Sequence, residues 1–222
     1  MDAIVVKNKK AYIDKEECVE CGICYRSMVC PTSAIFINKL KWPRIIRQVF
    51  SDPTTVHEET KLLGRGTEEV KTNDITNRIK SGEIGIGIEV GRPCVGTKFK
   101  EVDKITTTIA QSTIPVKFEK ENPLTSLMKD EQTGELRKDI LQERAMSVII
   151  EFKLEIQYFD ILLLLLKKIE NDLETVFSLS LTTKIEKSGE MYIIPTMNIL
   201  RKKGIMPYNN GKINVGLGST ST

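Results

Sequence analysis

The chain has 222 residues, of which 40% are hydrophobic and 28% charged, and its formal net charge at pH 7 is +3. This length allows one ordinary domain with a buried core and a smaller module beside it. So small a net charge does not favour a nucleic-acid-binding protein. The longest apolar run, residues 161–166, is too short to cross a membrane. We therefore expect neither nucleic acid nor a membrane as a partner.

The first segment contains two short apolar runs, residues 3–6 and 11–13, which predict a β-hairpin with its turn at residues 7–10. The first ten residues, MDAIVVKNKK, lack the apolar core of a secretory signal. We therefore expect the chain to stay in the cytoplasm, a reducing compartment in which cysteines are not used for disulfides.

Four of the five cysteines follow in one short run: Cys18, Cys21, Cys24 and Cys30, the last of which precedes a proline. A C-x2-C-x2-C spacing brings three thiolates to the inside of one tight loop, whose backbone N–H groups point at the sulfurs. The run resembles the [4Fe–4S] module of bacterial-type ferredoxins, and the resemblance covers about residues 3–38. It implies a [4Fe–4S] cluster with Cys18, Cys21 and Cys24 among its ligands.

The spacing before the last cysteine departs from the family pattern. Five residues separate Cys24 from Cys30, whereas the common loop has three, and its fourth cysteine ligates the other cluster of a two-cluster protein. This chain has no second run of the kind. Two extra residues add about 7 Å of reach, which favours Cys30 as the fourth ligand of the same cluster. There are two alternatives: Cys94 is the fourth ligand, or the cluster has no fourth cysteine ligand.

Two other interpretations of the cysteine run compete with the cluster. Structural zinc sites usually have two separated C-x2-C pairs rather than three evenly spaced cysteines with one nearby. Disulfide frameworks belong to oxidising compartments, which the expected location argues against. The cluster is therefore the favoured interpretation, followed by zinc.

The stretch from residue 21 to 51 has no acidic residue but several basic ones: Arg26, Lys39, Lys41, Arg44 and Arg47. Cations near a negatively charged cluster favour its reduction. We interpret the stretch either as a docking patch for an acidic redox partner or as a solvated basic face.

Residues 39–81 show no sustained periodicity and are predicted to form an irregular connecting segment between residues 1–38 and the next domain. The segment holds the only histidine, His57. We favour exposure in a polar loop as the interpretation of His57, because no partner for acid–base work is visible in the sequence. A catalytic or ligand role is the alternative.

From residue 82 the chain alternates between strand and helix patterns. Period-two alternation predicts strands at residues 84–90, 114–118, 146–154 and 177–181. Helical spacing predicts helices at 99–109, with Thr97 as a candidate cap, at 135–144 and at 159–169. Strands with one polar face predict an antiparallel sheet with helices on one side.

The fold class is therefore α+β: a small N-terminal ferredoxin-type module, then a βαββαβ ferredoxin-like sandwich over residues 82–204 that resembles ACT-type domains by topology. The helix at 157–172 is apolar most of the way round, so it either packs under the middle segment or forms a homodimer. Residues 205–222 are predicted to be a C-terminal tail, and their glycines lack the pattern of a nucleotide loop.

No nucleophile–base pair is visible, which favours a protein that is not an enzyme by itself. We expect an iron–sulfur single-electron carrier, or an electron-transfer subunit, that docks to an oxidoreductase. The alternative is a redox-responsive regulatory protein whose ACT-like domain binds an effector or a partner.

Overall fold

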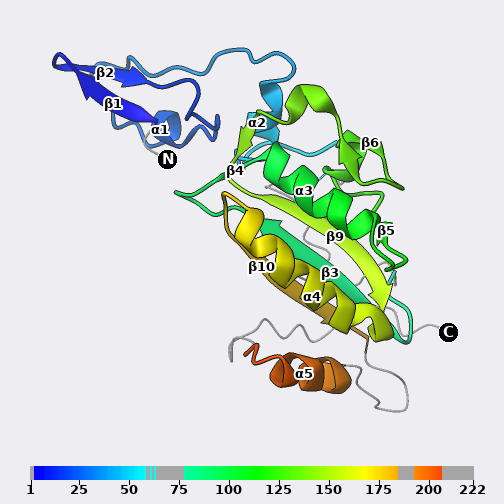
Figure 1. The fold of residues 1–222 in the computed structure, drawn as a ribbon. Coiled ribbons are helices and arrows are strands. Elements are labelled where there is room, and N and C mark those ends of the chain that lie inside the picture. The colour runs from blue at the N-terminus through cyan, green and yellow to red at the C-terminus, as the bar shows by residue number, and fades with distance from the viewer. Residues whose placement is uncertain (1–2, 59–60, 62, 64–77, 185–192, 207–222) are drawn as a thin grey trace.

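The structure is a computed structural model that describes residues 3–58, 61, 63, 78–184 and 193–206. Its N-terminal part contains strands β1 (Ile4–Lys7) and β2 (Lys10–Ile13), which pair antiparallel, and the short helix α1 (Ile23–Arg26) (Figure 1). The predicted hairpin is confirmed.

This N-terminal part has no hydrophobic core of its own. Val19 is the only buried residue between positions 3 and 45. Its large apolar side chains are instead exposed: Ile4, Val6, Tyr12, Ile13, Ile23, Tyr25, Met28, Val29, Phe36 and Ile37. Burial of apolar surface is the main source of folding free energy, so these residues contribute little of it.

The larger part is built on a four-stranded antiparallel sheet in the order β10-β3-β9-β5. Its strands are β3 (Glu83–Val90), β5 (Lys117–Phe118), β9 (Val148–Glu155) and β10 (Phe177–Thr183). Helices α3 (Phe99–Ala110) and α4 (Phe159–Ile169) lie side by side across one face of this sheet (Figure 1). The predicted strands and these two predicted helices are confirmed, although β5 is shorter than expected.

Alternation and helical spacing place the core between the sheet and the two helices. Ile84, Ile86 and Ile88 share one face of β3 because successive strand residues point to opposite faces, and all three are fully buried. Ile105 of α3 and Leu162 of α4 are buried in the same cluster. Each such side chain contributes about 1.5–3 kcal/mol when it leaves water.

Residues 119–147 form small elements instead of the helix predicted at 135–144, and that prediction is wrong. The elements are η1 (Thr125–Leu127), β6 (Met128–Asp130), β7 (Glu135–Leu136), η2 (Lys138–Ile140) and β8 (Arg144–Ala145). The Thr106 hydroxyl donates to the Gly134 carbonyl at 2.7 Å, and Asp103 accepts the Leu136 N–H at 2.8 Å. These bonds fasten the β6–β7 hairpin to α3, so residues 135–136 pair as a strand where the predicted helix would begin.

The predicted cap at Thr97 is also wrong. Thr97 lies in the short strand β4 (Thr97–Lys98), which pairs with β8, and α3 begins at Phe99. Lys98 occupies the N-cap position and makes no side-chain capping bond. Strand pairing therefore replaces a hydroxyl cap at this end of α3.

Part of the connecting segment, residues 39–81, packs into the hydrophobic core. Helix α2 (Ile45–Val49) buries Ile46, and the Phe50 ring packs edge-on against the Phe99 ring, with 5.2 Å between centroids. His57 is buried beside Phe50, with ring centroids 5.9 Å apart, so the expected exposure of His57 is wrong. The domain boundary at residue 82 stays a prediction, but Ile46 and Phe50 belong to the cluster that also holds the sheet residues.

Helix α5 (Ile193–Lys202) was not predicted. It buries Leu200 in the core, and Lys203 just after it pairs with Asp160 of α4 at 3.0 Å. Ile161 and Leu164 of α4 are exposed, so the homodimer stays a prediction. Two single turns complete the architecture, η3 (Ile156–Tyr158) before α4 and η4 (Glu170–Asp172) after it.

Within the described ranges, no helix combines the length and the apolar character that crossing a membrane requires. The predicted tail lies outside the described residues from position 207 onward.

Candidate metal centre in the cysteine loop

The four cysteines of the predicted cluster lie in one stretch between β2 and α2, residues 14–34, which we call the cysteine loop. Cys18, Cys21, Cys24 and Cys30 are each half-buried, and none of the chain's cysteines forms a disulfide. Cys94 is exposed. The cysteine loop therefore presents four thiols outside the hydrophobic core, where a ligand can reach them.

Local hydrogen bonds and two left-handed residues shape the start of the loop. The Asp14 carboxylate accepts the Glu16 N–H at 2.9 Å, and the Asp14 carbonyl accepts the Cys18 N–H at 2.9 Å. Glu20 and Gly22 have φ of 57° and 67°, and α1 begins directly after Gly22. Left-handed residues reverse the chain direction, so the backbone turns tightly between the first and third cysteines.

The Cys30 thiol accepts hydrogen bonds that stabilise its thiolate form. Its Sγ accepts the Ala34 N–H at 3.3 Å and lies 3.4 Å from the Thr32 hydroxyl. The Thr32 hydroxyl, followed by the backbone N–H of Ala34, lowers the pKa of the Cys30 thiol to about 7. Burial raises the pKa of the Cys18 thiol. Metals bind the thiolate form, which the lowered pKa makes available at Cys30 near neutral pH.

The arrangement of the cysteines meets part of what a cluster requires. Iron–sulfur clusters are held by cysteine thiolates, usually four, and the loop supplies four of them. In the part of the chain that the structure describes, no three His, Cys, Asp or Glu side chains are gathered closely enough to hold a metal ion. The donors thus fit in kind and number, whereas the structure does not bring them together into a cage.

Cys94, the alternative fourth ligand, lies in the turn that follows β3. Its φ is 71°, and the N–H groups of Val95 and Gly96 donate to the Arg92 carbonyl at 3.0 and 2.8 Å. The turn holds Cys94 at the surface. Cys94 and the cysteine loop are not joined by any metal-holding group among the described residues.

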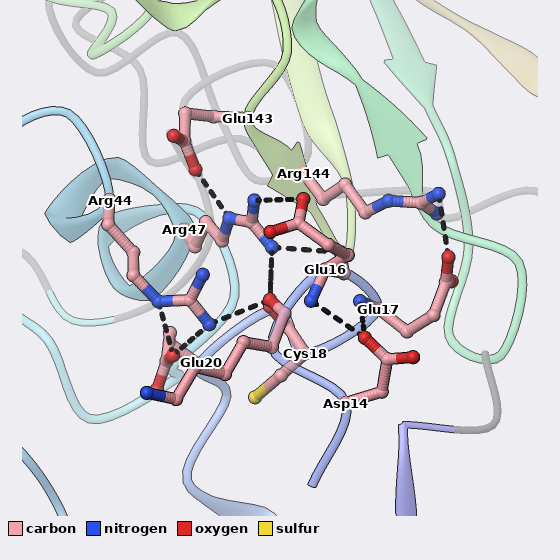
Figure 2. A network of polar contacts seen from close by, with 10 residues as sticks. Asp14, Glu16, Glu17, Cys18, Glu20, Arg44, Arg47, Glu143 and Arg144 are labelled. Atoms are coloured by element: carbon pink, nitrogen blue, oxygen red, sulfur yellow. Dashed lines mark hydrogen bonds and ion pairs between the residues drawn. The ribbon is translucent and has the colours of Figure 1, made fainter.

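A buried arginine fastens the start of the cysteine loop to the rest of the molecule (Figure 2). Arg47, on α2, has a side chain that is only 4% exposed. Its Nη1 donates to the carbonyl oxygens of Lys15, Glu16 and Cys18 at 3.0, 2.9 and 2.9 Å. Its Nε donates to the carboxylate of Glu143. One guanidinium thus joins three loop carbonyls to the segment before β8.

Two further arginines pair with acidic residues of the loop. Arg44 donates from Nε and Nη2 to Glu20 Oε1 at 2.8 and 2.6 Å, and its Nη2 also reaches the Lys15 carbonyl at 2.9 Å. Arg144 pairs with Glu17 at 2.9 Å. These contacts neutralise acidic side chains next to the cysteines, as Figure 2 shows.

A fourth arginine lies within the loop itself. Arg26 Nη2 donates to the Cys21 carbonyl at 2.6 Å, and its Nη1 donates to Asp52 Oδ1 at 2.8 Å. Burial works to raise the pKa of Asp52, but the N–H and hydroxyl of Thr54 and the Arg26 guanidinium together hold it below its usual value. Asp52 is therefore a carboxylate that balances Arg26.

These contacts correct one interpretation of the basic stretch. Arg26, Arg44 and Arg47 form ion pairs within the chain, and Arg47 is buried, so a solvated basic face is wrong for these arginines. Lys39 and Lys41 are exposed, so they stay available to a partner. The partners Asp52, Glu143 and Arg144 were not anticipated, because they are distant in sequence and carry no local pattern.

Comparisons with protein-family models, curated proteins and solved structures found no match for this chain. A proposal for its function therefore rests on the cysteine loop and its surroundings.

Proposed function

We propose that this chain is an iron–sulfur protein in which Cys18, Cys21, Cys24 and Cys30 hold a [4Fe–4S] cluster. In this proposal it serves as a single-electron carrier, or as an electron-transfer subunit, for an oxidoreductase. A bound cluster would supply the one-electron chemistry, while the chain supplies the ligands, their surroundings and the choice of partner.

The observation that carries the proposal is the contrast between cysteine content and burial in the first 45 residues. Four half-exposed thiols lie in a part of the chain where Val19 alone is buried. Fixing the backbone of one residue costs about 1–2 kcal/mol, and apolar burial here cannot offset that cost. Metal–thiolate bonds provide folding free energy in small modules of this kind. The loop therefore has the thiolate donors for a cluster, and metal–thiolate bonds would supply the folding free energy that apolar burial does not.

Other residues of the chain support the same role. The low pKa of Cys30 makes its thiolate available near pH 7. This property favours Cys30 over the exposed Cys94 as the fourth ligand. The N-terminal part carries several exposed lysines: Lys7, Lys9, Lys10, Lys39 and Lys41. Positive charge of this kind speeds association with an acidic surface, so we propose an acidic redox partner.

We further propose that residues 82–204 form a βαββαβ ferredoxin-like sandwich. The strand order β10-β3-β9-β5 and the two helices on one face of the sheet support this topology. The small elements of residues 119–147 would then be an insertion between the two β-α-β halves.

The arginine contacts favour one alternative, a redox-responsive regulatory protein. Arg47 ties the cysteine loop to Glu143, and Arg144 ties Glu17 to β8, so a change in the loop would act on the α+β part. In that case the cluster would serve as a sensor rather than as an electron carrier.

Anaerobic reductive titration of the full chain, followed by re-oxidation, tests the proposal. We expect one electron per chain to be taken up and released, with the visible absorbance bleached and then restored. Irreversible loss of the absorbance on re-oxidation would favour the regulatory alternative. Anaerobic protein with no redox-active absorbance would contradict both functions.

A further inference from the structure

The hairpin formed by β1 and β2 leaves the outer edge of β2 open. All four residues of β2, Lys10–Ile13, are exposed, and Figure 1 shows the hairpin at one end of the molecule, away from the four-stranded sheet. A two-stranded hairpin is only marginally stable by itself, and further strands or a packed helix normally stabilise it. Among the described residues, no third strand pairs with β1 or β2. An added strand would therefore stabilise this hairpin.

The hydrogen-bond pattern of the hairpin shows which backbone groups of β2 point outward. The Asp14 N–H donates to the Ala3 carbonyl at 2.7 Å, so these two residues form a hydrogen-bonded pair. Hydrogen-bonded and non-hydrogen-bonded pairs alternate along an antiparallel ladder, and the next pair, Ile4–Ile13, is therefore non-hydrogen-bonded. The N–H and C=O groups of Ile13 and Ala11 thus point away from β1. In the part of the chain that the structure describes, no backbone bond reaches them from outside the hairpin.

We propose that β2 is a self-association edge, which pairs antiparallel with β2 of a second copy of this chain. The two hairpins then form one continuous sheet in the order β1-β2-β2-β1, with a two-fold axis at Tyr12. In this register the outward N–H and C=O groups of Ala11 bond to those of Ile13 of the partner subunit. The proposal concerns the hairpin and does not depend on a metal in the cysteine loop.

The side chains of β2 complement those of a second copy in this register. Tyr12 faces Tyr12 of the partner subunit, and cross-strand aromatic pairs stabilise adjacent strands. Lys10 faces the partner subunit's Asp14, and the two-fold symmetry creates this pair of opposite charges twice. The Asp14 carboxylate accepts the Glu16 N–H at 2.9 Å, and it keeps lone pairs that can accept from an ammonium group. The edge therefore matches itself in charge as well as in shape.

Other registers of the same edge lose this charge match. An axis at Ala11 places Lys10 opposite the partner subunit's Tyr12, and an axis at Ile13 places Tyr12 opposite the partner subunit's Asp14. Neither brings Lys10 to an acidic side chain. The axis at Tyr12 is therefore the register that the sequence of β2 favours.

The same charge match favours a second copy over an unrelated extended peptide. Exposed lysines on an edge strand normally discourage pairing, because they bring positive charge to the open backbone groups. Here the charge of Lys10 is balanced by the partner subunit's Asp14. Lys9 and Lys15, the next positions outward, lie in turns, where the chain leaves the direction of the strand. Their like charges are therefore not held opposite each other.

Self-association is measured by analytical ultracentrifugation of the full-length, reduced protein over a range of concentrations. The paired edge is short, so the dimer should be weak, and the mean mass should rise from 25.1 kDa toward twice that value as concentration increases. Lys10→Glu replaces two attractive pairs by two repulsive ones and should weaken the dimer about tenfold. Leu164→Ser, which changes an exposed apolar residue of α4, is the control and should leave the association unchanged.

Cross-linking tests the register. The two Tyr12 residues form a non-hydrogen-bonded pair, whose Cα atoms should lie about 4.5 Å apart, within the reach of a disulfide. Tyr12→Cys should therefore form a disulfide between the two introduced thiols when diamide is added as the oxidant, and mass spectrometry should detect the linked peptides. Val5→Cys is the matched control, because Val5 pairs with Tyr12 on β1 but lies one strand away from the axis. It should form no such link.

The proposal is supported if the wild type self-associates, Lys10→Glu weakens the dimer and Tyr12→Cys cross-links. A chain that stays monomeric at every concentration would overturn it and leave the edge to a strand of another protein. Loss of the dimer in Leu164→Ser but not in Lys10→Glu would also overturn it, because the association would then use α4. A link in Val5→Cys without one in Tyr12→Cys would assign the pairing to β1 instead.

Discussion

Arg47 and Glu143 form an ion pair between residues that lie 96 positions apart in the chain. The same guanidinium also donates to the carbonyl oxygens of Lys15, Glu16 and Cys18. Because one side chain makes all of these bonds, the start of the cysteine loop cannot move independently of the segment before β8. A second ion pair, Arg26–Asp52, joins a later part of the loop to the segment after α2.

Removal of the Arg47 side chain should destabilise the whole molecule. Arg47→Met leaves Glu143 and three carbonyl groups without their donor, and loss of one partner from a buried ion pair costs about 3 kcal/mol or more. Thermal or denaturant unfolding of the full chain measures the change. Lys129→Met is the control, because Lys129 and Glu135 form an exposed pair at 3.7 Å, and it should cost about 0.5 kcal/mol or less. Equal effects of the two variants would contradict the anchoring role.

Phe50 should matter to the core even though it precedes residue 82. Its fully buried ring packs against Phe99, so Phe50→Ala should lower the free energy of unfolding by about 3–5 kcal/mol. Ile45→Ala, at the more exposed start of α2, the helix that ends just before Phe50, should cost about 1 kcal/mol. If both changes were equally mild, residues 45–50 would not share the core of the α+β part.

Cys30 should be the most reactive thiol of metal-free, reduced protein near pH 7. Its pKa of about 7 leaves roughly half of it as thiolate there, whereas burial raises the pKa of Cys18 and keeps it protonated. Thr32→Val removes the main cause of the low pKa, so alkylation of Cys30 should slow several-fold at pH 7. The rates of variant and wild type should converge above pH 9, where both thiols are ionised.

Mass spectrometry of alkylated peptides across this pH range measures the effect. Ser33→Ala is the control, because Ser33 is not among the causes of the shift. A Cys30 rate that rises only above pH 8 in wild-type protein would contradict the assignment.

The fourth ligand can be identified by substitution. Cys18→Ser, Cys21→Ser, Cys24→Ser and Cys30→Ser should each remove most of the iron, because each deletes one thiolate from the set. Cys94→Ser should leave the iron content near that of wild type. Iron loss in Cys94→Ser, with iron retained in Cys30→Ser, would reverse the assignment of the fourth ligand.

The regular elements of the larger part could be predicted from the sequence because each buries one face. Ile84, Ile86 and Ile88 alternate along β3, and Val102, Ile105 and Ile109 recur along α3, so their periods are visible in the sequence. Helix α5 has buried residues at a similar spacing but was not predicted. The helix predicted at 135–144 is wrong because the bonds that hold β7 in place, from Thr106 and Asp103, come from another element.

The cysteines of the candidate site were identified from their spacing alone, but their surroundings were not. The Arg26–Asp52 and Arg47–Glu143 pairs join positions 26 and 96 residues apart, and no periodicity links such residues. The burial of His57 against Phe50 likewise depends on how α2 packs. Local composition leaves a docking patch and a solvated basic face open for this stretch, whereas the fold pairs Arg26, Arg44 and Arg47 with carboxylates of the same chain.

The most direct test of the central claim is the iron, inorganic sulfide and zinc content of the full chain purified without oxygen. We predict about four iron atoms and four sulfides per chain, with little zinc, because four cysteine thiolates in one loop suit a [4Fe–4S] cluster. One zinc ion per chain without inorganic sulfide would contradict the account.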